Sequence, residues 1–437
     1  MHRVIDRRRP FVAGLVLALV GALLGGCGGS SVSRSHSAAS TTSPSVSGET
    51  GTPATTAPAA GPATSGTATS GAASTEPGSN GAAATGGATG GAVTTSPATC
   101  TVAAQSPPAG TISANFPTAL AFAPDGRLFF TERGGTVRVV QGGQPKVFAT
   151  VATVTTEAGG GYSERGLLGV AIDPGFTQNH YVYAFYSDPN RTQQHVIRWT
   201  DCAGVGTRAT VLLTFPSGSD CCHKGGRLAF GPDGKLYVTL GDEHTAGGTV
   251  AQNTQDVRGK VLRYNTDGTV PTDNPFGAGD PVWVYGLRNP FGIAFSPGGQ
   301  LAITNNGPTG EIPGGPGTGY DTVIFAAPRG AGYQWPGCYG YGHPNPGGSC
   351  AGLLPPDWSS ETTTVVPTGA TFVDAAGPAG YANHLVACSH TGGMLVFTPG
   401  APHGNETAGP STCLLDVKEG PNHALYFSSD TAIYRLG

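Results

Sequence analysis

Three polar residues that could do chemistry together stand at equivalent positions in separate repeats of the chain. Glu164, His223 and Arg288 each precede an apolar segment by about five or six residues. A histidine can accept a proton near neutral pH, and a fixed guanidinium can stabilise a negative charge that develops during a reaction. We therefore take these residues as candidates for one site, provided that the fold brings them together.

A second set of polar residues follows the apolar segments instead of preceding them. Its members are Glu132, Asp188, Asp242, Glu243, Asn305, Asn306, His390 and Asp430. In a hairpin the turn reverses the chain, so residues before the first strand and after the second lie at the same end. Both sets should therefore meet as an acid-rich collar around one pocket.

One unit positions these residues: an apolar strand, a Pro/Asp/Gly turn and a second strand. Its copies are AFAPDGRLFFTE (121–132), VAIDPGFTQNHYVYAFYSD (170–188), LAFGPDGKLYVTLGDE (228–243), IAFSPGGQLAITNNG (293–307), ATFVDAAGPAGYANHLVACSH (370–390) and VKEGPNHALYFSSD (417–430). Six such units predict an all-β fold, a six-bladed propeller whose blades converge on an axis. A β-sandwich with coincidental turns is the alternative, but it does not explain the repeated order.

The ends of the domain also predict closure. The last repeat runs to the end of the sequence without a capping segment. A strand around Ile433 and Tyr434 should therefore complete a blade with strands from near Thr111, because closure removes exposed sheet edges.

Composition limits the classes of partner. Only 11% of the 437 residues are charged and the formal net charge is -4, so nothing favours DNA or RNA binding. The 71 glycines and 36 prolines suit many short strands with tight turns.

The first residues read as a targeting segment. A basic stretch with Arg7, Arg8 and Arg9 precedes an apolar run at 11–24, and Leu24-Gly25-Gly26-Cys27 resembles a bacterial lipobox. We expect residues 1–27 to be a lipoprotein signal peptide, with Cys27 as the lipid anchor on the outer face of the membrane. An ordinary signal peptide is the alternative, and the paired arginines also resemble a twin-arginine signal.

A linker should separate this anchor from the folded domain. Residues 28–100 are mostly Ser, Thr, Ala, Gly and Pro without any Phe, Tyr or Trp, so they cannot bury enough apolar surface to fold. The propeller is expected to occupy residues 101–437.

Eight cysteines other than Cys27 suggest up to four disulfides in an exported protein. Cys338 and Cys350 bracket a Gly/Pro-rich loop and are the best pair. Cys221 and Cys222 form either a vicinal bridge or two separate bridges, for which Cys202 is an obvious partner. A zinc site is a weaker alternative, because the spacings match no common ligand pattern.

Several stretches resemble one known family. They are ERGLLGVAIDPGF, HKGGRLAFGPDGKLYVTLGD, GKVLRYNTDGTVPTDNPF, VYGLRNPFGIAFSP, NNGP and GAGYQWP, in this order between residues 115 and 340. The chain thus resembles the glucose/sorbosone dehydrogenase family, which includes soluble glucose dehydrogenase and aldose sugar dehydrogenases that use pyrroloquinoline quinone. Beyond Cys350 only the repeat pattern continues.

The resemblance assigns catalytic roles to two residues. It implies that His223 is the general base that takes the proton from the anomeric hydroxyl of a sugar while hydride passes to the quinone. It implies that Arg288 faces a quinone carbonyl. A loop histidine without a role, and an arginine that braces neighbouring blades, are the bland alternatives.

The resemblance also implies ligands for calcium and for the cofactor. The carbonyls of Gly307 and Pro308 match calcium ligands beside the quinone, although a Gly-Pro turn needs no metal. Asp321 and Tyr333 fall near a second calcium position. The residues expected to touch the quinone itself are Glu164, Arg288, Asn306 and Lys224.

Two departures from the family concern the cofactor. Glu164 stands where the family has a glutamine. The lysine and the two arginines that hold the carboxylates of the quinone are also missing: His390 lies near the lysine position, and Cys413 and Leu415 occupy the arginine positions. Buried anions without cationic partners are costly. Candidates that might replace these cations are Arg133, Lys224, Arg227 and Lys418.

Three functions follow as hypotheses. The favoured one is a calcium- and quinone-dependent aldose dehydrogenase that oxidises a sugar to a lactone and passes electrons to an unidentified acceptor. The second is a non-catalytic propeller lipoprotein that binds a glycan or a protein. The third is a calcium-dependent, lactonase-like hydrolase.

Overall fold

The computed structural model describes residue 100 and residues 102–398, 400–401 and 406–437. The predicted signal peptide and almost all of the predicted linker lie outside these residues. Within the described part, no helix has the length and apolar character needed to cross a membrane.

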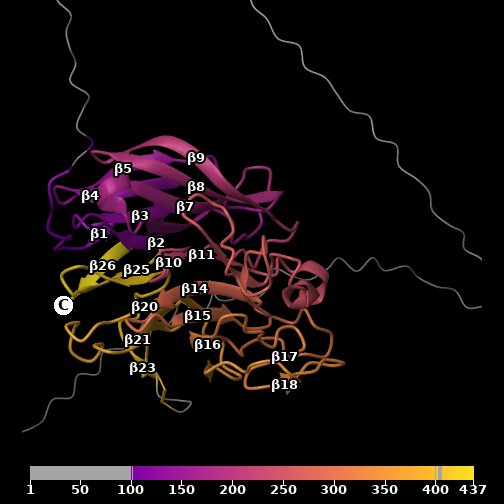
Figure 1. Ribbon diagram of the computed structural model, residues 1–437. Coiled ribbons are helices and arrows are strands. Elements are labelled where there is room, and N and C mark those ends of the chain that lie inside the picture. Colours follow the sequence, from indigo (N-terminus) through magenta and orange to yellow (C-terminus); the bar gives the residue numbers. More distant parts are fainter. Residues whose placement is uncertain (1–99, 101, 399, 402–405) are drawn as a thin grey trace, which may run out of the picture. The chain divides into compact units, whose positions relative to one another are not determined.

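The described chain forms six four-stranded antiparallel sheets, five of which follow one another along the sequence. We number these five sheets as blades 1 to 5. Blade 1 consists of β2 (Pro117–Phe122), β3 (Leu128–Glu132), β4 (Thr136–Gln141) and β5 (Gln144–Thr150), and blade 2 of β6 (Leu167–Ile172), β7 (Tyr181–Ser187), β8 (Gln193–Cys202) and β9 (Val205–Pro216). Blade 3 consists of β10 (Leu228–Phe230), β11 (Leu236–Leu240), β12 (Lys260–Tyr264) and β13 (Val282–Tyr285), blade 4 of β14 (Asn289–Phe295), β15 (Leu301–Asn306), β16 (Thr322–Ala327) and β19 (Trp358–Ser359), and blade 5 of β20 (Pro367–Phe372), β21 (Leu385–Ser389), β22 (Gly393–Phe397) and β23 (Glu406–Ala408). The predicted all-β, six-bladed propeller is confirmed (Figure 1).

Blade 6 joins the two ends of the domain. Its order is β1 (Ile112–Ser113), β26 (Ala432–Leu436), β25 (Leu425–Ser428) and β24 (Val417–Glu419). Ile112 pairs with Ile433, so the first strand of the domain completes the last blade, as predicted. Figure 1 shows this contact where the yellow strands β25 and β26 lie beside the indigo strand β1.

Shorter elements decorate the blades. They are α2 (Phe176–Asn179), the 3-10 segment η1 (Thr245–Gln252), and a two-stranded sheet of β17 (Cys338–Tyr339) and β18 (His343–Pro344). The last sheet belongs to a long connection inside blade 4, between β16 and β19.

The hydrophobic core is divided among the interfaces between neighbouring blades. The alternating strand pattern supplies apolar side chains on both faces of each sheet, so every sheet packs against two others. Buried clusters of this kind lie between blades 1 and 2, 2 and 3, 3 and 4, 4 and 5, 5 and 6, and 6 and 1. This ring of interfaces holds the inner ends of the blades around the axis.

A buried arginine ties several blades together at the axis. Arg227 directly precedes β10 and is 5% exposed. Its guanidinium donates to backbone carbonyls of blades 1, 2 and 4 and of the segment that leads into blade 6: Thr118, Leu168 at 3.0 Å, Phe291 at 3.0 Å and Leu415 at 2.7 Å. These carbonyls face the centre of the fold, where no strand partner is available, and the five donors of arginine suit them.

Four disulfides occur in the described part of the chain. The predicted Cys338–Cys350 bridge is present, and Cys221–Cys222 forms the vicinal bridge of the two alternatives. Cys202 does not join that pair. It lies at the end of β8, and the β8–β9 hairpin brings it to Cys100 at the start of the domain, to which it is bonded. The fourth bridge, Cys388–Cys413, connects blade 5 to the segment that leads into blade 6.

Candidate active site

The loop before β10 presents His223 at the inner end of blade 3. His223 has φ of 59°, and the two glycines that follow Lys224 also have positive φ, so the loop turns sharply before the strand. Gly241 follows β11 and packs against this loop: a Cβ there would lie 2.0 Å from the carbonyl oxygen of His223. The close approach brings the residues after β11 beside the histidine, as the hairpin argument predicted.

The carboxylate of Asp242 holds the His223 ring. Nδ1 of His223 lies 2.5 Å from Oδ1 of Asp242, which also accepts the backbone N–H of His244 at 2.9 Å. Oδ2 of Asp242 accepts the indole N–H of Trp335 at 2.6 Å. Both carboxylate oxygens are therefore engaged, which fixes the ring orientation and assigns the proton of the neutral imidazole to Nδ1.

The surroundings keep the imidazole neutral. Burial and the nearby charge of Arg288 lower the pKa of His223, although Asp242 acts in the opposite direction. Burial also opposes the ionisation of Asp242, but the interaction with His223 and the charge of Arg288 outweigh it and lower the pKa of that carboxyl. A neutral histidine with its Nε2 lone pair free can accept a proton at neutral pH.

Arg288 is held in one orientation beside this pair. Its Nε donates to Glu311 and one terminal nitrogen donates to Oγ1 of Thr309 at 2.8 Å. The guanidinium also lies 5.6 Å from the centroid of the Trp335 ring. Burial opposes the ionisation of Glu311, but the charge of Arg288 and the hydrogen bonds to this carboxylate together outweigh it and lower the pKa of Glu311 to about 2. Trp335 therefore contacts both Arg288 and, through its indole N–H, the partner of His223.

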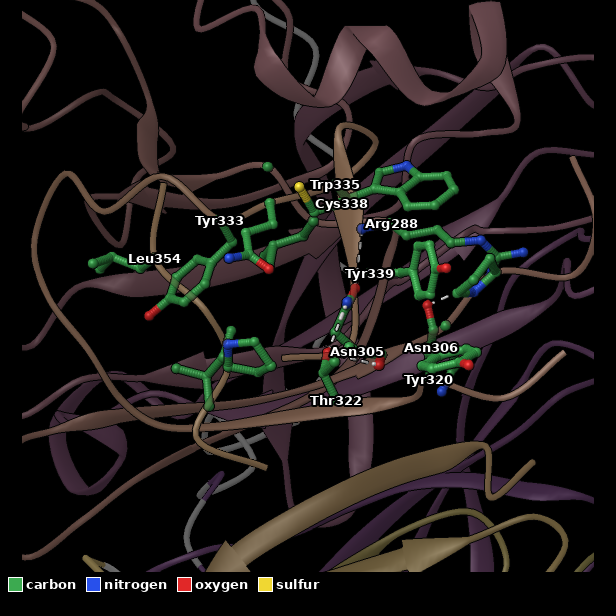
Figure 2. A pocket seen from close by; sticks show the side chains of 18 residues that line it. Arg288, Asn305, Asn306, Tyr320, Thr322, Tyr333, Trp335, Cys338, Tyr339 and Leu354 are labelled. Atoms are coloured by element: carbon green, nitrogen blue, oxygen red, sulfur yellow. Dashed lines mark hydrogen bonds between the residues drawn. The ribbon is translucent and has the colours of Figure 1, made fainter. Parts of the chain in front are cut away.

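A cavity opens next to Arg288 (Figure 2). Among the residues that line it are Arg288, Asn306, Gly307, Pro308, Tyr333 and Trp335. Five of these six belong to the predicted site. His223, Glu164, Lys224 and Asp321 do not line the cavity; His223 is connected to it through Asp242 and Trp335.

The candidate calcium ligands lie around the segment after β15. A Cβ on Gly307 would lie 2.2 Å from the carbonyl oxygen of Gly319 and 2.5 Å from that of Tyr320, so backbone oxygens crowd this position. One carboxylate oxygen of Asp321 accepts the N–H of Gly307 at 2.8 Å, and the other accepts two further backbone N–H groups. Burial raises the pKa of Asp321 against these hydrogen bonds. Carbonyl and carboxylate oxygens are the ligand types that calcium prefers.

Glu164 and Asn289 connect blade 2 to blade 4. Oε2 of Glu164 accepts the side-chain amide of Asn289 at 3.1 Å and the backbone N–H of Lys224 at 3.2 Å. The same amide donates to Asn306 at 3.3 Å. Glu164, Asn306 and the His223 loop are thus brought together, as the repeat predicted, with Asn289 as the link.

Lys224 binds protein groups and does not support its predicted role as a cofactor contact. Its ammonium is fully buried in an ion pair with Glu243 and also approaches Ser217 and Gly218. Burial lowers the pKa of Lys224 and raises that of Glu243 to about 7, although each partner favours the charged form of the other. This pair is internally satisfied.

The other cations suggested as replacements are also engaged by the protein. Arg133 donates to three backbone carbonyls, Arg227 to four, and Lys418 to the carbonyl of Ala370 at 2.8 Å. Of the positions where the family has cations, Cys413 is disulfide-bonded, Leu415 is buried, and burial lowers the pKa of His390. The described part of the chain therefore offers no replacement for the missing carboxylate clamp among these residues.

Sequence reasoning missed five residues of the site. Asp242 belongs to the predicted collar, which assigns it no chemical role, and Asn289 and Trp335 lie in stretches that resemble the family. Nothing in the local sequence points to Glu311 or His244, because each reaches the site from a loop.

Comparisons with known proteins agree with the fold. The family model described as glucose/sorbosone dehydrogenase matches residues 114–435. Quinoprotein glucose dehydrogenase B of Acinetobacter calcoaceticus is 33% identical over 258 residues, which are 52% of this chain and 51% of the relative. The aldose sugar dehydrogenase YliI of Escherichia coli is 32% identical over 232 residues, 50% of this chain and 58% of the relative. The chain therefore spans about half the length of these curated relatives.

Solved structures extend the likeness to the whole propeller. An oxidoreductase (glucose dehydrogenase) from Thermus thermophilus is 28% identical with a TM-score of 0.64, and the match covers 75% of this chain and 99% of that one. The family model spans most of the chain, including strands of all six blades. This chain therefore belongs to the glucose/sorbosone dehydrogenase family.

Proposed function

We propose that this chain is a sugar dehydrogenase that oxidises the anomeric carbon of an aldose to a lactone, with pyrroloquinoline quinone and calcium as cofactors. The observation that carries the proposal is the contact between His223 and Asp242, which orients the histidine ring near the fixed charge of Arg288, in a member of this family.

The chain's own residues supply a base and electrostatic stabilisation. Nε2 of His223 takes the proton of the anomeric hydroxyl, and Asp242 stabilises the imidazolium that forms. When bound, the quinone supplies the acceptor for the hydride from the same carbon, and calcium polarises that acceptor. Arg288 lies where its charge can stabilise the negative charge that builds up on reduction.

The residues at the reacting end fit these groups. Arg288 and Asn306 line the cavity and would contact the quinone, with Glu164 beside Asn306. The carbonyls of Gly307 and Pro308, with Asp321 and Tyr333 close by, offer oxygen ligands for calcium.

The far end of the quinone fits less well. Its carboxylates need cationic partners, and the cations considered above already bind protein groups. We therefore propose that the quinone is held weakly and exchanges with the solution, so that the purified protein needs added quinone for activity.

A titration tests this function. Purified protein is titrated with quinone in the presence and absence of calcium, and aldose oxidation is followed with an artificial dye. We expect saturable, calcium-dependent activity. Calorimetry on the same samples measures quinone binding. Quinone binding without turnover of any aldose would reject the proposed dehydrogenase activity, and no heat of binding would reject the quinone as cofactor.

The second candidate is a binding module that recognises a glycan or a protein through the same end of the propeller. Its support is the engagement of every cation proposed for the carboxylate clamp, which leaves acidic residues such as Glu164 on the collar. Under this alternative the protein shows no activity with quinone, and binding to a glycan array persists when His223 is replaced.

We also propose that the protein is exported and anchored to the membrane through a lipid on Cys27. The disulfides of the described residues support an oxidising location. Labelling of cells with a fatty-acid probe should mark the wild-type protein and not Cys27→Ala; equal labelling of both would exclude the anchor.

A further inference from the structure

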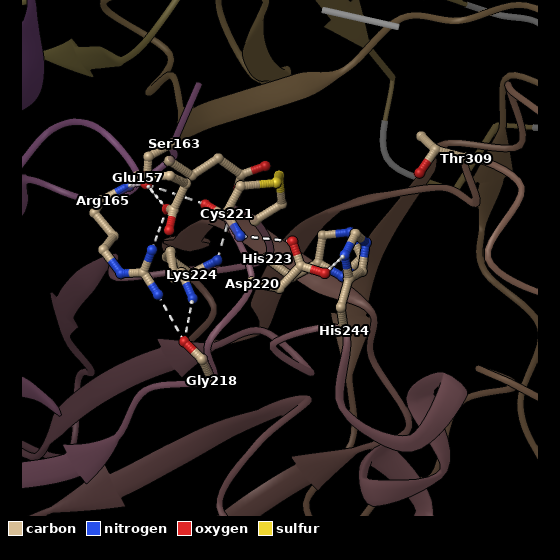
Figure 3. The surroundings of a disulfide bond; sticks show 12 residues. Glu157, Ser163, Arg165, Gly218, Asp220, Cys221, His223, Lys224, His244 and Thr309 are labelled. Carbon is tan, nitrogen blue, oxygen red and sulfur yellow. Dashed lines mark hydrogen bonds and ion pairs between the residues drawn. A yellow bond between two sulfur atoms is a disulfide. The ribbon is translucent and has the colours of Figure 1, made fainter. Parts of the chain in front are cut away.

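Two histidines lie against each other beside the vicinal disulfide (Figure 3). The ring centroids of His223 and His244 are 3.7 Å apart, with the planes at 75°. Glu311, which comes from a loop of blade 4, completes a group: one possible ligand atom from each of these residues lies within 4.8 Å of the others. Such a spacing is close to that of ligands around one metal ion.

Both rings are oriented in the same way by a carboxylate. Nδ1 of His223 lies 2.5 Å from Asp242, and Nδ1 of His244 lies 3.0 Å from Asp220. Metal-binding histidines commonly donate one ring N–H to a carboxylate, which leaves the other nitrogen as the ligand. In both residues this nitrogen is Nε2.

His244 provides an independent sign of a missing ligand. Its side chain is 9% exposed, and its Nε2 is buried without a hydrogen-bond partner among the described residues. An unpaired buried polar atom costs free energy, and a bound ion would remove that cost.

We propose that Nε2 of His223, Nε2 of His244 and the carboxylate of Glu311 bind a divalent transition-metal ion of the zinc type. Two imidazoles and one carboxylate suit zinc and its neighbours, whereas calcium requires oxygen ligands. The charges around this position also suit a dication. Three carboxylates lie there, those of Asp220, Asp242 and Glu311, against one cation, Arg288, which is bonded to Glu311.

Binding of this ion has a consequence for catalysis. The metal takes the same Nε2 lone pair that His223 needs as a base, so an occupied site is inactive. Zinc is then a reversible inhibitor. This consequence rests on the proposed function, whereas the site itself does not.

Cobalt(II) provides a readout that does not depend on activity. The full-length protein, treated with a chelator and dialysed, is titrated with Co²⁺ and its visible absorption is recorded, and Zn²⁺ then displaces the cobalt. We expect saturable binding that His244→Ala weakens by about 100-fold or more. Asp220→Asn removes only the supporting carboxylate and should weaken binding about 10-fold.

His343→Ala is the matched control, because His343 pairs with Glu361 at 2.9 Å on the surface and belongs to no such group among the residues that the structure describes. It should bind cobalt as the wild type does. Circular dichroism shows whether His244→Ala folds, and Asp220→Asn gives the answer if it does not. Equal binding by the wild type and Asp220→Asn, or no saturable absorption in the wild type, would overturn the site. If cobalt binds but no sugar is oxidised with quinone, the metal site stands and the proposed function fails.

Discussion

Nδ1 of His223 lies 2.5 Å from Oδ1 of Asp242, and the second oxygen of that carboxylate accepts the indole N–H of Trp335 at 2.6 Å. The histidine comes from the loop before β10, the aspartate follows β11, and the tryptophan belongs to the long connection of blade 4. One carboxylate thus joins the base of blade 3 to the wall of the cavity beside Arg288.

Replacing Asp242 by asparagine tests this connection. Since the carboxylate raises the pKa of His223 against burial, Asp242→Asn should lower that pKa further. The acid limb of kcat/KM should then move to lower pH, because His223 must be unprotonated to act as a base. We expect kcat to fall by about 10² to 10⁴-fold, since the orientation and the stabilisation of the imidazolium are lost. A fall in kcat with an unmoved acid limb would mean that Asp242 has only a structural role.

Replacing Arg288 by glutamine should move the same limb in the opposite direction. The charge of Arg288 lowers the pKa of His223, so Arg288→Gln should raise that pKa. When the pH is lowered, the variant should then lose activity at a higher pH than the wild type does. The rate should fall as well, because the fixed charge is gone. Glu311→Gln is the control, since it keeps the guanidinium but removes the ion pair that holds it. Limbs that shift in the same direction for Arg288→Gln and Asp242→Asn would contradict the arrangement.

Replacing Glu164 by glutamine should strengthen the binding of quinone. Its carboxylate lies beside Asn289 and Asn306, where a quinone with three carboxylates would approach. Glu164→Gln keeps the shape of the side chain and removes one negative charge, so we expect quinone to bind about 10-fold more tightly. Calorimetry at constant calcium measures the change. Weaker binding by the variant would show that Glu164 is not close to the cofactor.

Arg227 should be important for stability and not for chemistry. Arg227→Met leaves four backbone carbonyls from different parts of the ring without their donor, and we expect a loss of about 3 kcal/mol in the free energy of unfolding. Arg329→Met is the control, because Arg329 is exposed and makes one hydrogen bond to a carbonyl. Denaturant unfolding of both variants distinguishes them. Equal stabilities would mean that these carbonyls are satisfied without Arg227.

The blades could be predicted from the sequence because each repeat carries its own strand and turn signals. The hairpin geometry also predicted that Glu164, His223 and Asn306 would lie near one another, and they do. The pairing of Cys202 could not be found in this way. Its partner Cys100 is far away in the sequence, and only the length of the β8–β9 hairpin brings the two together.

The loop residues of the site were beyond the reach of sequence reasoning for the same reason. Glu311 and His244 belong to no repeat, and their positions depend on how loops of blades 3 and 4 pack around Arg288 and His223. The ion pair between Lys224 and Glu243 could not be predicted either, because Glu243 belongs to the predicted collar and Lys224 was expected to contact the quinone, so either side chain could have faced the centre.

The central claim is that His223 is the base of a sugar dehydrogenase, and His223→Ala tests it most directly. The wild type and the variant are compared in the dye assay with saturating quinone, calcium and aldose, and quinone binding is measured by calorimetry on the same samples. The account predicts that the variant binds quinone within about twofold of the wild type while kcat falls by about 10² to 10⁴-fold. Equal rates for the two proteins would contradict it.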